Sequence, residues 1–263
     1  MKDSEKLHIT VLGCGTSTGV PVPACRCPVC LSKHPRNQRT RTSILVTLPG
    51  GENILVDTSP DLRFQVLRHK VDHIDAVLFT HAHADHIMGL DDLRAYNFAQ
   101  KAEIPCYATN ETFSKIKKIF WYVFDHDLNI EGGTPPRLKV MPFDYYRPIK
   151  LFGFDVTPFK LLHGSMEVAG FRFGEFSYAT DCKIIPKQSM DYVDNAKLLI
   201  LTGLREAPHN THLTIPEAVE LAGKLNTDQT YLIHMSHDVD YEKTSKQLPD
   251  NIRLCYDGLS LKI

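Results

Sequence analysis

The sequence predicts a layered α/β domain in which two β-sheets are sandwiched between helices. Short apolar runs bounded by Gly, Pro or Asp dominate its first half, a pattern typical of buried strands. Runs with helical spacing alternate with these strands, and polar residues gather where the strands end. Such an alternation favours sheets covered by helices over an all-helical bundle or an all-β barrel.

The predicted strands are apolar and separated by turn residues: Leu7–Gly13, Thr42–Leu48, Asn53–Thr58, Ala76–Thr80, Leu138–Pro142, Ile149–Leu162, Phe171–Thr180, Leu198–Thr202, Thr230–Met235 and Ile252–Ile263. Helical spacing predicts helices over Asp61–His69, from Glu111 to about Phe124 and around Tyr241–Leu248. Another helix opens with the capping pattern of Thr214 and Glu217 and runs to about Leu225.

Length and composition indicate one domain over residues 1–263, because 263 residues with 43% hydrophobic content can bury a large core. Lysine and arginine total 30 against 31 acidic residues, which argues against nucleic acid and membrane surfaces as partners.

The N-terminus lacks a signal-peptide pattern, and no apolar run approaches the ~18 residues of a membrane span. The seven cysteines favour a reducing compartment, so we expect a cytoplasmic protein. A homodimer is compatible with the sequence.

The most specific motif is Thr80-His81-Ala82-His83-Ala84-Asp85-His86, which directly follows an apolar strand. Three imidazoles and a carboxylate held at a strand end can converge on one small volume. This combination of ligands suits zinc, manganese or iron. Two later histidines, His163 and His234, also follow predicted strands, although either one taken singly also fits a hydrogen-bonded structural histidine.

This motif resembles the His-x-His-x-Asp-His motif of the metallo-β-lactamase superfamily, and the resemblance extends over nearly the whole chain. It implies a four-layer αββα sandwich with two divalent metal ions, manganese or zinc, in the active site. The implied ligands occur in the family's order: His81, His83 and His163 for one metal, Asp85, His86 and His234 for the other, and Asp181 as the bridge. Asp85 is predicted to be catalytic as well as a ligand.

Two metals about 3.5–4 Å apart can share a hydroxide, lower the pKa of its parent water and clamp a phosphate. Asp57, at the end of Ile54-Leu55-Val56-Asp57, matches the family's first acidic motif. The resemblance implies that Asp57 accepts an N–H from a ligand imidazole. The alternative is a turn residue at a strand end.

Cys25-x-Cys27-x2-Cys30 predicts a structural zinc loop at about residues 19–34, but tetrahedral zinc needs a fourth ligand. The cluster resembles that of the phosphoribosyl cyclic phosphodiesterases of bacterial phosphonate breakdown, where it follows a Gly-Val-Pro turn. In that family the second histidine of a His-x-Ser-His motif completes the site. The resemblance therefore implies His237 as the fourth zinc ligand, at the end of His234-Met235-Ser236-His237.

The same family places a histidine beside the leaving group, 22 residues before the last metal histidine, and His212 has this spacing from His234. A histidine can protonate a departing alkoxide near neutral pH. His209 is the alternative acid. Arg94 either reaches a substrate phosphate or pairs with Asp91.

Both resemblances imply a metal-dependent phosphodiesterase acting on a small or cyclic phosphodiester. A tRNA 3′-processing endonuclease is the main alternative, but the basic arm that grips tRNA is not evident, and Arg39 and Arg41 are expected to be loop residues. A di-iron oxidoreductase is disfavoured because no flavin-binding domain follows. A non-enzymatic protein similar to the pyrroloquinoline-quinone biosynthesis family is disfavoured because candidates occur at all seven ligand positions.

Overall fold

The computed structural model describes residues 6–125 and 133–263 and shows two seven-stranded mixed sheets packed face to face. In spatial order the first sheet contains β14 (Ser260–Lys262), β1 (His8–Gly13), β2 (Ser43–Thr47), β3 (Asn53–Val56), β4 (Ala76–Leu78), β5 (Ile104–Ala108) and β6 (Leu138–Pro142). The second contains β13 (Ile252–Leu254), β12 (Gln229–Ile233), β11 (Leu198–Thr202), β10 (Phe176–Ala179), β9 (Met166–Phe173), β8 (Phe154–His163) and β7 (Ile149–Leu151).

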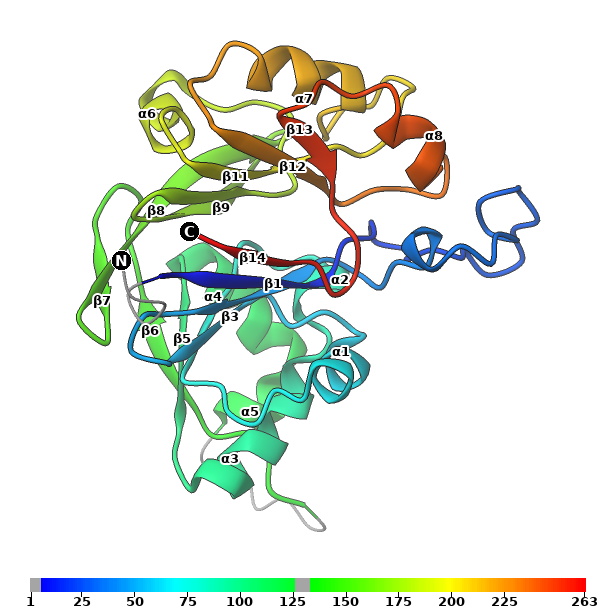
Figure 1. Cartoon of the computed structure of the whole chain (residues 1–263). Coiled ribbons are helices and arrows are strands. Elements are labelled where there is room, and N and C mark those ends of the chain that lie inside the picture. The colour runs from blue at the N-terminus through cyan, green and yellow to red at the C-terminus, as the bar shows by residue number, and fades with distance from the viewer. Residues whose placement is uncertain (1–5, 126–132) are drawn as a thin grey trace.

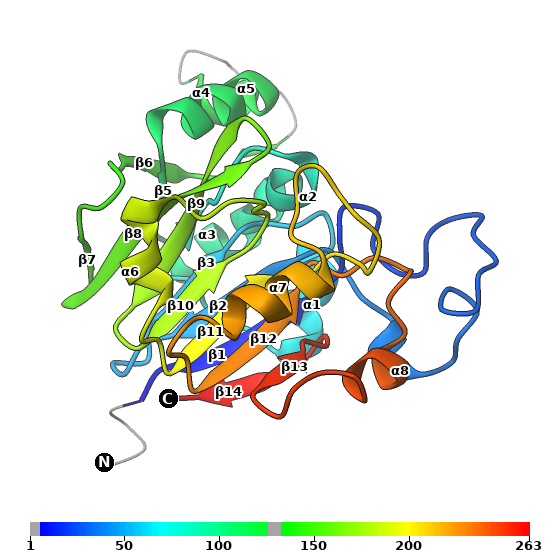
Figure 2. The ribbon, with the colours of Figure 1, turned by 90° about the horizontal axis from the view of Figure 1, so that it is seen from above.

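Helices cover the outer face of each sheet, so the predicted four-layer αββα sandwich is confirmed (Figure 1). The first sheet carries α1 (Leu62–His69), α3 (Arg94–Gln100), α4 (Asn110–Ile119) and α5 (Trp121–Phe124). The second carries α6 (Met190–Val193), α7 (Ile215–Ala222) and α8 (Tyr241–Ser245), of which α6 and α7 lie over its strands in Figure 2. Within residues 6–125 and 133–263, the remaining helical segments are α2 (Ala84–Ile87) and three short 3-10 turns, Pro35–Asn37, Leu90–Leu93 and Lys187–Ser189.

The core follows the two-residue period of the strands. In β3, Ile54 and Val56 face the second sheet, whereas Leu55 faces the helices on the outside. Strand β2 repeats this arrangement with Ile44 and Val46 on the inside. Both faces of these strands are apolar, which explains why they read as continuous hydrophobic runs. Among the described residues, no helix combines the length and the hydropathy that a bilayer crossing requires.

Three predicted strands were wrong in length because each is interrupted by a turn. The run predicted as Ile149–Leu162 forms β7 and β8, which pair across Phe152 and Gly153, both with positive φ. The run predicted as Phe171–Thr180 divides at Gly174 into β9 and β10. The run predicted as Ile252–Ile263 forms β13 and β14, which belong to different sheets.

Elsewhere the differences are smaller. The helix predicted from Glu111 to Phe124 breaks at Phe120, whose φ of −104° and ψ of 42° end α4 before α5 begins. Strand β5 and helix α6 were missed. In β5 the apolar residues are interrupted by Pro105, which hid the strand pattern.

Helix α7 begins with the predicted capping box. The Thr214 hydroxyl accepts the Glu217 N–H at 3.3 Å, and the Glu217 carboxylate accepts the Thr214 N–H at 2.9 Å. Two backbone donors that the helix leaves unpaired are thereby satisfied.

Replacement of the cap should destabilise the fold measurably. We expect Thr214→Ala to lower the free energy of unfolding by about 1 kcal/mol, the usual cost of a lost N-cap. Urea denaturation of wild type and variant measures this difference. Thr214→Ser keeps the hydroxyl and is expected to retain most of the stability. Equal losses in both variants would show that the capping bond is not the cause.

Candidate metal centre

The predicted site residues lie where strands of both sheets end. Asp57 directly follows β3, and His81 lies three residues beyond β4. From the second sheet, His163 is the last residue of β8, Asp181 lies two residues beyond β10 and His234 directly follows β12. The two sheets therefore meet at this edge to bring together side chains that are far apart in the sequence.

Three of these residues have left-handed backbone conformations. The φ angles of Asp57, Asp181 and His234 are 64°, 54° and 65°. Non-glycine residues occupy this region at a cost of order 1 kcal/mol or more. The cost is tolerated at the strand ends, where the turn directs each side chain toward the site.

One group of four side chains has its ligand atoms within 4.8 Å of one another: Asp85, His86, Asp181 and His234. The His86 Nε2 atom lies 3.2 Å from Asp181 Oδ2 and 3.3 Å from Asp85 Oδ2. The His234 Nδ1 atom lies 3.1 Å from Asp181 Oδ1. Asp85, His86 and His234 are the ligands predicted for one of the two metals, and Asp181 is the predicted bridging carboxylate.

The three histidines predicted for the other metal lie beside it. The ring centroid of His81 is 4.5 Å from that of His83 and 5.8 Å from that of His163, and the last two rings are 5.1 Å apart. Asp181 Oδ2 is also 3.9 Å from His81 Nε2, so this carboxylate lies between both groups. His83 is exposed, which leaves this side of the site open. The structure thus brings all seven predicted side chains together.

The buried nitrogens fit metal ions. Among the described residues, the Nε2 atoms of His81 and His86 are buried and form no aligned hydrogen bond, although buried polar atoms are normally paired. The two carboxylate oxygens 3.2 and 3.3 Å from His86 Nε2 are close to it without hydrogen-bond alignment. Burial lowers the pKa of His81, His83 and His234, which favours the neutral imidazole that binds metal. Burial has the same effect on His86, but Asp181 and two further carboxylates raise its pKa well above the usual value. A bound cation would replace that proton.

Asp57 and Thr80 orient two of the histidines. Asp57 Oδ2 accepts the Nδ1–H of His86 at 2.7 Å, as the resemblance implied, which leaves Nε2 of His86 free to ligate. The Thr80 hydroxyl donates to the same Asp57 oxygen at 2.8 Å and lies 2.9 Å from His81 Nδ1. Because this hydroxyl has donated its hydrogen, it accepts the Nδ1–H of His81. Sequence reasoning missed Thr80, although its place before the first histidine of the motif was the available signal.

His212 lies against both histidine groups. Its ring centroid is 4.4 Å from that of His163 and 4.9 Å from that of His234, and its ligand atom lies within 4.8 Å of those of His163 and Asp181. The ring is buried, and burial lowers its pKa to about 3. This position suits either a proton donor or an additional ligand. A role for Asp85 beyond metal binding stays a prediction.

Two arginines considered in the sequence analysis, Arg94 and Arg41, pair with aspartates outside the set of candidate metal ligands. Arg94 is half exposed and pairs with Asp91 at 3.5 Å, the alternative to a phosphate contact. Arg41 pairs with Asp61 at 2.7 Å.

Arg39 lies outside the named strands, as expected for a loop residue, but its side chain is buried, which the sequence did not indicate. Its guanidinium donates to the carbonyl oxygens of Ser236 and Val239 at 2.9 and 2.7 Å. It also donates to Arg36 O and Asn37 Oδ1. Arg39 therefore holds the segment after His234 against the cysteine loop.

The cysteine loop projects from the sandwich beside α8 (Figures 1 and 2). Its three cysteines and His237 form a Cys3His cluster. His237 Nδ1 lies 3.2, 3.6 and 3.5 Å from the Sγ atoms of Cys25, Cys27 and Cys30. Zinc–ligand bonds of ordinary length place tetrahedral S and N ligands about 3.6 Å apart. The Cys30 N–H donates to Cys27 Sγ at 3.4 Å and lowers the pKa of the Cys27 thiol to about 7, whereas burial raises that of Cys30 to about 11. The cluster fits the predicted structural zinc.

Residues 52–235 match the sequence profile of the Beta-lactamase superfamily domain. The chain belongs to the beta-lactamase superfamily. This match confirms the resemblance that the histidine motif indicated.

Known structures of the superfamily agree with this assignment. The chain is 40% identical to a structure described as a new diphosphatase from the PhnP family, with a TM-score of 0.91 over 98% of this chain and 97% of that one. Zn(2+)-bound PqqB from Methylobacterium extorquens is 20% identical, with a TM-score of 0.78 over 97% of this chain and 99% of that one. The short form of human tRNase Z is 18% identical, with a TM-score of 0.68 over 97% and 98%. The last two likenesses show the fold alone.

A curated relative from Porphyromonas gingivalis, called octanoyltransferase, is 38% identical over 255 residues. The match covers 96% of this chain and 51% of that protein, so the chain spans about half the length of this relative.

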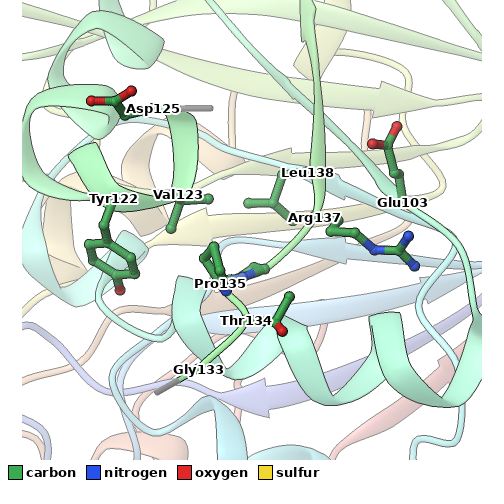
Figure 3. Close-up of a pocket in the computed structure, with 10 residues that line it drawn as sticks. Glu103, Tyr122, Val123, Asp125, Gly133, Thr134, Pro135, Arg137 and Leu138 are labelled. Atoms are coloured by element: carbon green, nitrogen blue, oxygen red, sulfur yellow. The ribbon is translucent and has the colours of Figure 1, made fainter. Parts of the chain in front are cut away.

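A separate cavity of about 370 Å³ lies between α5 and the start of β6, where Tyr122, Arg137 and Glu103 are among its lining residues (Figure 3). None of the predicted superfamily site residues lines it.

Loss of the Thr80 hydroxyl should weaken metal binding. We expect Thr80→Val to lower the affinity for the metal pair about 10–100-fold, because Asp57 and His81 lose the group that orients them. Competition with a chromogenic chelator measures this affinity. Thr230→Val removes a buried hydroxyl on β12 away from the site and serves as the matched control. A similar drop in both variants, or none in Thr80→Val, contradicts the orienting role.

The cysteine cluster should hold zinc independently of the metal pair. We expect Cys27→Ser to lose about one zinc per chain and to lower Tm, since a closed thiolate site adds its binding free energy to folding. Elemental analysis and thermal denaturation measure both quantities. Cys106→Ser changes a buried cysteine outside the cluster and should leave the zinc content unchanged. Unchanged zinc content and Tm in Cys27→Ser would exclude the cluster as a zinc site.

Proposed function

We propose that the chain is a metal-dependent phosphodiesterase that hydrolyses a small or cyclic phosphodiester. The observation that carries this proposal is the position of Asp181 between two groups of histidines. One histidine of each group, His81 in the first and His86 in the second, has a buried Nε2 atom close to this carboxylate. The 40% identity to a PhnP-family diphosphatase supports chemistry at a phosphorus centre.

The donor set determines what the site would hold. His81, His83 and His163 would bind one divalent ion, and Asp85, His86 and His234 the other, with Asp181 shared between them. Imidazole and carboxylate ligands accept both zinc and manganese. When bound, such a pair supplies an activated water as the nucleophile and neutralises the charge of a phosphate.

The side chains of this chain would orient the metal ligands and protonate the leaving group. Asp57 and Thr80 keep the ligand nitrogens of His86 and His81 directed inward. His212 lies beside both groups and would donate a proton to the leaving oxygen. Burial lowers the pKa of His212 to about 3, and a negatively charged phosphodiester beside the ring would raise it toward the range where it can act as an acid.

The other functions have less support. The likenesses to tRNase Z and PqqB extend to the fold, and the net charge of −1 gives the chain no overall positive charge to attract tRNA. The activity named for the octanoyltransferase relative is not proposed for this chain. The four cysteines of this chain that lie outside the Cys3His cluster are buried, and burial raises the pKa of each thiol. Outside the cluster, therefore, no accessible thiolate is available to carry an acyl group.

Cytoplasmic localisation and a homodimer stay predictions.

The test combines metal reconstitution with two classes of leaving group. The reconstituted protein should hydrolyse bis(4-nitrophenyl) phosphate and a cyclic phosphodiester such as 2′,3′-cyclic AMP, and chelation should abolish both activities. His212→Ala should reduce turnover of the cyclic alkoxide substrate by roughly 10²–10⁴-fold, because an alkoxide needs a proton to depart. The loss on the nitrophenyl ester should be much smaller, with metal content unchanged.

Asp181→Ala provides the contrasting variant in the same experiment. It should lose metal and turnover together on both substrates, because one carboxylate contacts both groups. If His212→Ala behaves in this way too, then His212 is a ligand. If the wild-type protein hydrolyses neither ester, the proposed function is wrong.

A further inference from the structure

Two threonine hydroxyls next to strands of the first sheet contact His234, the candidate ligand that follows β12. Thr42 directly precedes β2, and its hydroxyl lies 3.1 Å from His234 Nδ1. Thr16 follows β1, and its hydroxyl lies 3.2 Å from His234 Nε2. Thr42, Thr16 and His234 are all buried. Both nitrogens of this ring are therefore hydrogen-bonded within the folded chain.

The contacts of Nδ1 determine which nitrogen of His234 carries the hydrogen. Thr42 has one hydroxyl hydrogen, which it donates to the carbonyl oxygen of Gly15 at 2.8 Å. At His234 its oxygen can therefore only accept. Asp181 Oδ1, 3.1 Å from the same Nδ1 atom, is a carboxylate oxygen and also an acceptor. Nδ1 thus carries the hydrogen, and in the neutral ring Nε2 carries the lone pair.

The lone pair of Nε2 is occupied by Thr16. The Thr16 hydroxyl donates to this nitrogen, because an unprotonated ring nitrogen can only accept. In this tautomer Nε2 is also the nitrogen through which His234 can bind a metal ion. The hydroxyl hydrogen of Thr16 and a metal ion would therefore compete for the same lone pair.

Backbone contacts hold both threonines beside His234. The Thr16 N–H donates to the carbonyl oxygen of Met235 at 3.1 Å. Gly15 forms one bridge to the residue before Thr42 and another to Met235. The carbonyl group that accepts from Thr42 is thereby fixed, and with it the direction of the Thr42 hydroxyl.

We propose that Thr42 is a positioning residue that directs Nε2 of His234 to the metal centre, and that Thr16 holds this nitrogen until a metal ion binds. The two hydroxyls then act on metal affinity in opposite directions. Loss of the Thr42 hydroxyl weakens binding, and loss of the Thr16 hydroxyl strengthens it. This inference rests on the metal centre of the proposed function and is independent of which ester is cleaved.

The experiment titrates Mn²⁺ into the full chain, with one equivalent of zinc supplied for the Cys3His cluster. Free Mn²⁺ is followed by its electron paramagnetic resonance signal. Imidazole and carboxylate ligands suit Mn²⁺ better than thiolates do, so the titration reports on the candidate centre. We expect Thr42→Val to weaken binding about 10–100-fold, the usual effect of losing a group that orients a ligand. We expect Thr16→Val to strengthen it about two- to tenfold, because no hydrogen bond has to be broken.

Two further variants separate positioning from folding. Thr42→Ser keeps the hydroxyl and should bind Mn²⁺ within about threefold of wild type. Thr18→Val removes an exposed hydroxyl of the same loop as Thr16 and should leave the affinity unchanged. Equal losses in Thr42→Val and Thr42→Ser, or no loss in Thr42→Val, would overturn the role of Thr42. Unchanged or weaker binding in Thr16→Val would overturn the role of Thr16.

The tautomer is tested on the metal-free wild-type protein, without any change to either threonine. Nitrogen-15 NMR of the histidine rings distinguishes a hydrogen on Nδ1 from a hydrogen on Nε2. The signal that is lost in His234→Gln identifies His234. We expect the Nδ1–H form. The Nε2–H form would overturn the proposal, even if Thr42→Val does not fold.

Wild-type Mn²⁺ binding and ester hydrolysis distinguish this inference from the proposed function. If the wild type binds Mn²⁺ and cleaves phosphodiesters but the threonine variants bind like wild type, the roles of Thr42 and Thr16 are wrong and the proposed function stands. If the variants differ as expected but no phosphodiester is cleaved, the phosphodiesterase activity is wrong and the threonine roles stand. If the wild type binds no Mn²⁺ at this centre, the threonine roles are wrong.

Discussion

The hydrogen bonds to the buried carboxylate of Asp57 are the interaction on which the candidate centre depends. Asp57 accepts from the backbone and hydroxyl of Thr80 and from Nδ1 of His86, and its side chain is excluded from solvent. Burial raises the pKa of this carboxyl group, and the contact with His86 lowers it. Removing one partner of such a buried charged group typically costs several kcal/mol. One side chain thereby fixes the ends of β3 and β4 and the orientation of two candidate ligands.

The segment from His234 to His237 connects the two candidate metal sites. His234 enters the dinuclear group and His237 the cysteine cluster, three residues later. Backbone hydrogen bonds join Met235 to Cys14 and Thr16, and Arg39 donates to the carbonyl of Ser236. Backbone hydrogen bonds also pair Arg39 with Val20 at the start of the cysteine loop, so Arg39 stabilises the position of this loop relative to His234. The Cys3His cluster is thus part of the framework around the candidate metal centre.

The loop before α7 lies against the candidate centre. The carbonyl of Thr211 in this loop accepts the Nδ1–H of His163, and its N–H donates to His209 Nδ1. The next residue, His212, lies beside both His163 and His234. A candidate ligand thus positions the loop that carries the proposed proton donor.

Much of the fold and of the candidate site could be predicted from local patterns. The apolar runs predicted β1–β4, β6, β11 and β12 to within a few residues, and the Thr214 cap marked the start of α7. The motif from His81 to His86 and the cysteine spacing both depend on residues that are close in sequence, so they were visible without a structure. The later ligand candidates His163, Asp181 and His234 needed the family's order as well.

Tertiary structure decided what depends on contacts between distant segments. The sequence could not divide the runs at Phe152, Gly174 and the turn before β14, because turn conformation and strand partners are set by the sheets that form. It gave no sign that the Arg39 side chain is buried, since no local pattern shows that a guanidinium will meet carbonyls of a segment about 200 residues away. The role of Thr80 likewise depends on the folded chain, which brings its hydroxyl to Asp57 and to Nδ1 of His81. The sequence alone determined which chemical groups are available, and only the folded chain determined which atoms of those groups face one another.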